Sequence, residues 1–254
     1  MTIFFPSKDE IRLGKPPLDE VICQVRFTPI LRIAKDIPIE FQEIVRDRFP
    51  GLRVEQNFIV QLPGAVSTEK PGIDVAPKTY RFLSLDEKSH VALAVDFFAL
   101  STKDYSHWRN FKNDLGFVES AVREIYHPGP ANRIGLRFVN RFTRKNTGSK
   151  DTTEILQLFR SELTCLIQAE AWLEPAEMLS QIVLVEGKTK LTLRTGFGRE
   201  KKEPFFVLDF DCFEEGQINL DHLIERIEPY HTKIYDAFRW CLLDESLERF
   251  SPRS

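Results

Sequence analysis

An alternating pattern runs through residues 132–142, NRIGLRFVNRF. Arginine recurs at every fourth position, as Arg133, Arg137 and Arg141. The positions that would face the opposite way are mainly apolar: Ile134, Leu136, Phe138 and Phe142. Because successive side chains of a β-strand point to opposite faces and the strand rises ~3.3 Å per residue, this pattern predicts a strand with an arginine stripe roughly 26 Å long. One face of such a strand requires a core, and the other requires anionic partners.

The composition is typical of a folded, β-rich protein. The chain has 254 residues, of which 42% are hydrophobic and 11% aromatic, so it is long enough for one large domain or two small ones. Phenylalanine accounts for 21 residues and methionine for only 2, which favours a sheet interior packed with rings. A net charge of −3 and a pI near 6.0 argue against a protein that coats duplex nucleic acid, although a local basic groove is compatible with them.

The sequence predicts a cytoplasmic protein that does not enter a membrane. Its first residues lack the cationic start and apolar core of a secretory signal, and no apolar run approaches the ~20 residues needed to span a bilayer. Four cysteines are scattered singly, without the spacing of a zinc site, so we expect them to be reduced and mostly buried: Cys23, Cys165, Cys212 and Cys241. No motif indicates a cofactor.

The periodicity of apolar residues divides the chain into two similar halves, residues 1–145 and 146–254. In the first half it predicts strands at 18–27, 54–62, 80–85, 90–100 and 132–142, helices at 41–49 and 105–126, and a loop at 63–77. In the second half it predicts helices at 153–167 and 220–250 and strands at 178–185, 190–197 and 205–213. Each half has a hairpin, then a strand containing Asp-Phe, then its longest helix. We therefore expect an α+β fold in which helices cover one face of an antiparallel sheet, with two duplicated ferredoxin-like halves as one form of it.

Several short segments resemble those of an uncharacterised, sporadically distributed family of bacterial and archaeal proteins of about this length. They span most of the chain and comprise residues 17–21, 104–111, 133–141 and 231–250. The resemblance implies a shared fold but no established activity, so it transfers no catalytic residue. The patchy distribution of such a family would suit a defence or mobile gene module.

The arginine stripe permits three interpretations. Asp209 and Asp211 share one face of their own predicted strand, so they could pair with the arginines across neighbouring strands. Alternatively, Arg133, Arg137 and Arg141 could bind a small anion or nucleic acid, since a guanidinium group presents a planar fork of donors. The third interpretation is a magnesium site at the two aspartates, for which the sequence offers no third ligand.

Among the histidines, His107 is the best candidate for an acid or base, because tyrosine and arginine side chains could approach it. No serine or cysteine nucleophile is paired with it by a recognisable spacing. His222 and His231 are nine residues apart on the predicted closing helix, so they face different sides and cannot share a metal ion. The sequence therefore favours a protein that is not an enzyme.

Two functions follow from these observations. The first is a non-catalytic accessory protein that binds a protein partner or a small anionic ligand. It would form a homodimer through the closing helix, whose apolar surface exceeds what one sheet face can cover. The alternative is an RNA-binding protein or metal-independent endoribonuclease of ferredoxin-like type, which would use the arginine stripe for phosphates and His107 as acid or base. The acidic pI disfavours RNA.

Overall fold

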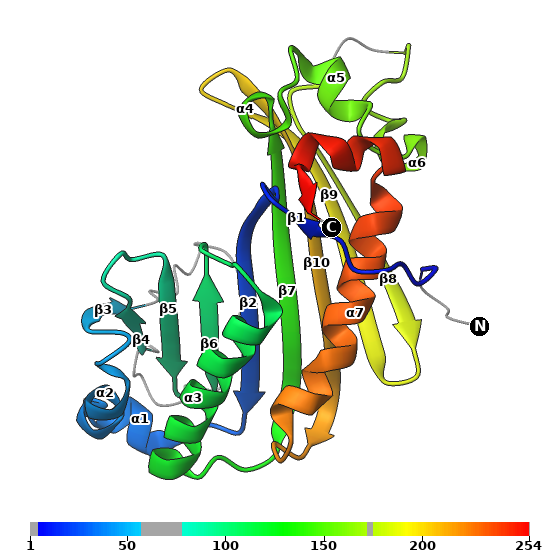
Figure 1. Ribbon diagram of the computed structural model, residues 1–254. Helices are drawn as coiled ribbons and strands as arrows, with labels where there is room; N and C mark the ends of the chain where they lie inside the picture. Colours follow the sequence, from blue (N-terminus) through cyan, green and yellow to red (C-terminus); the bar gives the residue numbers. More distant parts are fainter. Residues whose placement is uncertain (1–4, 57–77, 172–174, 254) are drawn as a thin grey trace, which may run out of the picture. The chain divides into compact units, whose positions relative to one another are not determined.

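The computed structural model describes residues 5–56, 78–171 and 175–253 and has an α+β fold (Figure 1). Nine strands form a large antiparallel sheet in the order β3-β4-β5-β6-β2-β7-β10-β9-β8, and β1 (Arg12–Leu13) pairs separately with β11 (Pro252–Arg253). The chain forms two compact units. Unit 1 comprises Met1–Ile22, Gly135–Glu215 and His222–Ser254, and unit 2 comprises Cys23–Ile134 and Gly216–Asp221. Three strands contribute residues to both units: β2 (Leu18–Phe27), β7 (Ala131–Thr143) and β10 (Glu203–Ile218).

Unit 2 consists of antiparallel strands with three helices. Its strands are β3 (Gly51–Gln56), β4 (Lys78–Leu83), β5 (Ser89–Ala94) and β6 (Phe97–Thr102), each antiparallel to the next, and its helices are α1 (Leu31–Lys35), α2 (Ile39–Val45) and α3 (Trp108–Tyr126). The helix α3 buries Phe111, Leu115, Val118 and Val122, which recur at helical spacing. It ends where His127 adopts a left-handed conformation (φ 45°) immediately before Pro128.

Unit 1 contains β7, β10 (Glu203–Ile218), β9 (Thr189–Glu200), β8 (Met178–Glu186) and the long helix α7 (Leu223–Cys241). The helix contacts the sheet at several strands: His231 lies against Phe138 of β7, Arg226 pairs with Glu214 of β10, and Lys233 pairs with Glu186 of β8. The shorter helices of this unit are α4 (Arg144–Thr147), α5 (Thr152–Leu156), α6 (Ser161–Thr164) and the 3-10 helix η1 (Asp244–Phe250).

The N-terminal residues of unit 1 lie along α7. The backbone N–H of Lys8 donates to Asp236 (3.0 Å), and that of Ile11 donates to the Tyr235 hydroxyl (2.7 Å). Further along the helix, the Trp240 ring contacts Phe5 at 5.0 Å between centroids, and the Arg160 guanidinium lies over the Trp240 ring. Part of the surface of α7, on which the prediction of a helix-mediated dimer rests, is therefore contacted by the chain's own residues.

The predicted helices 153–167 and 220–250 are each wrong in length. The first is two short helices, α5 and α6, and the second is α7 followed by η1. Both breaks have one cause: Leu242 is extended (φ −92°, ψ 148°) and forms a β-bridge with Phe159. The N–H of Leu243 donates to Leu158 O (3.0 Å), and the N–H of Arg160 donates to Cys241 O (3.1 Å), so these backbone groups are unavailable to a helix.

The predicted strand 90–100 is two strands, β5 and β6, which turn at Val95 and Asp96. The carbonyls of these turn residues accept hydrogen bonds from the N–H groups of Ile30 and Phe27. The predicted helix 105–126 begins later, at Trp108, and the helix 41–49 is α2 at Ile39–Val45. The strand predicted at 54–62 is β3 at Gly51–Gln56 as far as the structure describes it, and the rest of that prediction and the loop 63–77 lie outside the described residues.

The expected class, an antiparallel sheet with helices, is confirmed, whereas the duplicated ferredoxin-like halves are not. The division at residue 145 stays a prediction. Three of the four cysteines, Cys23, Cys212 and Cys241, are buried, and all four are free thiols. Within the ranges described, no helix is both long enough and apolar enough to cross a membrane.

Candidate functional site

The alternation predicted for β7 is confirmed. Ile134, Leu136 and Phe142 are fully buried and Phe138 nearly so, whereas Arg133, Arg137 and Arg141 are partly exposed on the other face. The buried face contacts phenylalanines of unit 1, for example Phe142 against Phe159 at 4.7 Å and against Phe250 at 5.8 Å. The core thus fixes which way the strand faces, and the arginines are directed away from it.

A row of four polar side chains crosses unit 1 from β7 to β8, and we call it the Asp209 row. Arg137 of β7 donates from Nε and Nη2 to the two carboxylate oxygens of Asp209 on β10, at 2.7 and 2.8 Å. Arg194 of β9 donates from Nη1 to Asp209 Oδ2 (3.2 Å) and from Nε to Gln181 Oε1 on β8 (2.8 Å). Two guanidinium groups therefore neutralise one carboxylate at the centre of the sheet face.

Two tight hairpin turns set the register of this row. Glu200 pairs with Glu203 around Lys201 and Lys202, which both adopt positive φ (50° and 73°), as a two-residue hairpin turn requires. The resulting register places Asp209 opposite Arg194. The hairpin between β8 and β9 turns at Gly187 (φ 60°) and its register places Arg194 opposite Gln181. The sequence interpretation missed Arg194 and Gln181, although both positions follow from counting back from these turns.

The geometry of the Asp209 row is that of an internal ion pair. Asp209 is 5% exposed, and both of its oxygens accept from guanidinium groups. The hydrogen bonds to Asp209 raise the pKa of Arg137 above its usual value. Because both prongs of the Arg137 fork are occupied, this arginine has less capacity to bind an external anion. A magnesium ion at Asp209 would likewise have to displace two cations.

The outer arginines of the stripe differ from Arg137. Arg141 pairs with Glu200 and lies over the Phe205 ring at 4.1 Å. Arg133 belongs to unit 2, where its charge counteracts the burial that raises the pKa of Cys23 to about 12. The stripe predicted as one ligand site is therefore divided among three different local environments.

His107 lines a hollow of about 310 Å³ in unit 2. Three carboxylates, Asp86, Asp104 and Asp114, line the same hollow. Asp86 accepts from the Ser84 hydroxyl (2.7 Å) and from the Lys88 backbone N–H (3.1 Å), and these bonds lower its pKa. Each of the three carboxylates has a cationic partner: Lys88 Nζ lies 3.9 Å from Asp86 and 3.4 Å from Asp104, and Arg48 lies 2.9 Å from Asp114. An RNA phosphate would have to compete with these carboxylates for the nearby cations.

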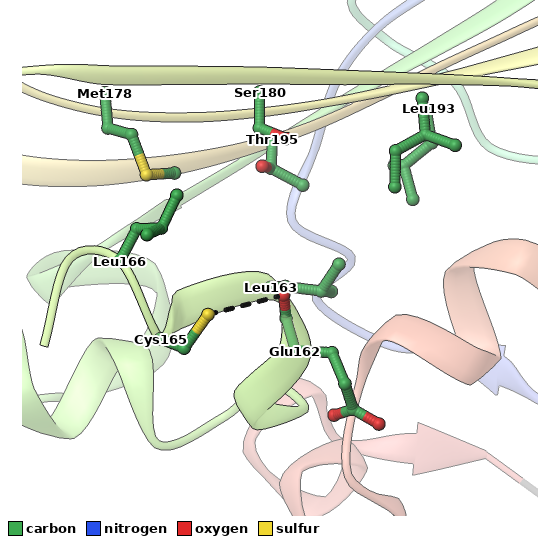
Figure 2. Close-up of a pocket in the computed structure, with 9 residues that line it drawn as sticks. Glu162, Leu163, Cys165, Leu166, Met178, Ser180, Leu193 and Thr195 are labelled. Carbon is green, nitrogen blue, oxygen red and sulfur yellow. Dashed lines mark hydrogen bonds between the residues drawn. The ribbon is translucent and has the colours of Figure 1, made fainter. Parts of the chain in front are cut away.

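A second, smaller hollow of about 50 Å³ lies between the α6 region and the sheet of unit 1 (Figure 2). Leu163, Cys165 and Leu166 line it from the α6 side, and Met178 and Ser180 line it from β8. Between its lining residues, the Cys165 thiol makes a long contact with the Glu162 carbonyl oxygen (4.0 Å). A hollow of this size and lining would accept an apolar side chain more readily than a polar substrate.

The strand β8 carries a concentration of exposed apolar side chains that sequence reasoning missed. They are Leu179 (77% exposed), Ile182 (49%), Val183 (48%) and Val185 (54%). Ile182 points to the face that carries α6 and α7, because it pairs with buried Leu193, whereas the other three point to the face of the Asp209 row. An apolar run in a strand normally predicts burial, so only the position of β8 at the end of the strand order reveals this exposure.

The sequence matches no family profile, and no functionally characterised protein is detectably similar to it. Within the described residues, no three histidine, cysteine, aspartate or glutamate side chains are grouped so that they could hold a metal ion. The candidate sites are therefore compared by their geometry alone.

Proposed function

We propose that this protein is a non-catalytic accessory protein that binds a protein partner through β8. The observation that carries the proposal is the set of four large apolar side chains exposed on this one strand. Leu179, Val183 and Val185 share one face of the strand and Ile182 lies on the other. Exposed apolar surface is characteristic of protein-binding sites, because its removal from water stabilises a complex. The Asp209 row lies beside these side chains, and its charged groups already pair with one another within the chain.

The geometry favours a protein partner over the other candidates. A small anion would have to compete with Asp209 for Arg137 and with Glu200 for Arg141. An RNA substrate acted on at His107 would meet the carboxylates of Asp86, Asp104 and Asp114. The dimer through the closing helix stays a prediction, and the contacts of Tyr235 and Trp240 with the N-terminal residues reduce the helix surface available to it.

Affinity capture from the source cell extract, with a matched pair of variants, tests this function. Leu179→Asp introduces a charge on β8, whereas Leu85→Asp introduces the same charge at a residue that is 90% exposed on a turn of unit 2. We expect wild type and Leu85→Asp to retain the same protein partner and Leu179→Asp to lose it. Retention of the partner by Leu179→Asp would contradict the proposal, as would co-purification of nucleic acid in place of protein.

A further inference from the structure

The strand β8 has the properties of an edge that pairs with another strand. It is last in the sheet order, so among the described residues it has a strand neighbour only at β9. Its register with β9 is continuous from Met178 to Glu186, without a bulge that would twist the outer edge away. Every second residue of such an edge directs its backbone N–H and C=O groups outward, where they can bond to another strand.

The sequence of β8 lacks the usual protection of an edge strand. Lysine, proline and inward-pointing charges commonly prevent edge-to-edge association. Residues 178–185, MLSQIVLV, include neither a charged residue nor proline. The single charged residue of the strand is Glu186 at its end, which pairs with Lys233 of α7. The same eight residues, 178–185, therefore lie at the edge of the sheet, are mainly apolar and carry no charge.

We propose that β8 pairs antiparallel with β8 of a second copy of this chain, around a two-fold axis at Ile182. This inference rests on the proposed function and names its partner. The two-fold arrangement makes the strand complementary to itself: Leu179 faces Val185, Ser180 faces Leu184, and Gln181 faces Val183 of the other copy. Leu179 thus meets Val185, and Ile182 meets Ile182 at the axis, and apolar cross-strand pairs of this kind stabilise a sheet.

Charge supports this register. Glu186 faces Met178 of the second copy, so the one charged residue of β8 does not meet its own equivalent. The two Ile182 side chains meet at the axis, on the face that carries the small hollow of Figure 2. Ile182 itself lines this hollow, and Leu166 at its rim is 57% exposed. The second copy would cover both side chains, so the apolar surface buried includes side chains from outside β8.

Light scattering and sedimentation test the association. We expect wild type to form a species of twice the 29.5 kDa chain mass at micromolar concentration. Ile182→Lys places two like charges opposite each other at the axis, so it should convert the dimer fully to monomer. The matched control is Val54→Lys, at a half-exposed position of β3 in unit 2, which should leave the dimer unchanged. Circular dichroism checks that both variants are folded.

A disulfide test fixes the register without disturbing the sheet. In a Cys165→Ser background, Ile182→Cys brings two thiols together at the axis, where paired Cα atoms are about 4.5–5.5 Å apart and a disulfide can form. Leu179→Cys faces Val185 and is three residues from the axis, so its two copies are too distant to join. We expect mild oxidation to cross-link the chain with Ile182→Cys and not the chain with Leu179→Cys.

The contrary outcomes are distinct. A wild-type chain that stays monomeric, a dimer that persists in Ile182→Lys, or a cross-link at Leu179→Cys in place of Ile182→Cys would overturn the β8 pairing. If the chain is monomeric but still captures another protein in a Leu179-dependent way, the self-pairing is wrong while the protein-binding function stands. If neither association nor capture depends on β8, both proposals are wrong.

Discussion

Two parts of the unit 1 sheet differ in how their exposed side chains are partnered. One part is β8, and the other comprises β7, β10 and β9. On the three strands, charged residues are placed opposite their counterions: Arg137 and Arg194 enclose Asp209, and Arg141 pairs with Glu200. On β8, the exposed side chains are apolar and have no counterpart of this kind. The charged residues of the sheet thus find their partners within one chain, whereas the exposed apolar residues of β8 are the surface on which the proposed association rests.

The other terminal strand of the sheet order, β3, provides a second comparison. It also exposes apolar side chains, Leu52 and Val54, but they alternate with Arg53 and Glu55. Arg53 pairs with Glu87 (2.6 Å), and Glu55 pairs with Arg81 (2.8 Å). Charges at such positions discourage pairing with another strand. The two terminal strands, β3 and β8, thus both expose apolar side chains but differ in whether charged residues lie between them.

The largest effect is expected from Arg137→Ala, which breaks the Asp209 row. It leaves the buried Asp209 carboxylate (5% exposed) paired with Arg194 but without Arg137, so we expect a loss of about 2–3 kcal/mol in the free energy of unfolding. Arg141→Ala is the matched control: its partner Glu200 is 63% exposed, so the loss should be under about 1 kcal/mol. Urea unfolding measures both, and equal losses would contradict the assignment of Asp209 as the organising residue.

The second prediction converts β3 into an edge like β8. The double variant Arg53→Val and Glu55→Val removes the two charges that alternate with Leu52 and Val54. We expect the variant to associate through β3 and to form species larger than the dimer, because an uncharged apolar edge is open to pairing. Sedimentation at increasing concentration measures this. A size distribution identical to that of wild type would show that charge is not what distinguishes the two edges.

The sequence predicted the charged part of the sheet better than the apolar part. The period-two pattern of β7 and the placement of Asp209 on one strand face are local properties, so the cross-strand pairing of Arg137 with Asp209 was among the expected alternatives. The break between α7 and η1 depends on backbone bonds from Leu243 and Arg160 to residues about 80 positions away. No local pattern reports such a contact. The exposure of β8 depends on strand order, which is also non-local.

A smaller effect is expected from a second buried carboxylate, Asp236 on α7, which sharpens the contrast with Asp209. Asp236 accepts from the Lys8 backbone N–H, and burial raises its pKa. A carboxyl group whose pKa is raised by folding contributes stability below its unfolded pKa of about 3.9, and that contribution is lost as the pH rises through its folded pKa. The substitution Asp236→Asn removes the ionisable group, so the variant does not lose this stability as the pH rises.

We therefore expect Asp236→Asn to be more stable than wild type at neutral pH. The gain should be smaller than the loss in Arg137→Ala. Below the unfolded pKa of aspartate, Asp236→Asn and wild type should be equally stable. Thermal melting across this pH range measures the difference. Asn keeps the oxygen that accepts from Lys8, so the contact with the N-terminal residues is retained. A gain that is the same at every pH, or that is largest in acid, would contradict the origin assigned to it.

The last prediction uses the thiols of wild type as reporters and perturbs the molecule least. Cys23, Cys212 and Cys241 are buried, and burial raises the pKa of each thiol, so almost no thiolate is available for reaction at neutral pH. Cys165 is exposed and lines the hollow beside β8, so it should be the one thiol per native chain that reacts with a disulfide reagent.

If β8 pairs with a second copy, the partner strand narrows access to this hollow. Cys165 should then react more slowly in the wild-type dimer than in Ile182→Lys, while Val54→Lys reacts at the wild-type rate. If Cys165 reacts at the same rate in all three proteins, any dimer interface lies away from the hollow, and the register centred on Ile182 is wrong.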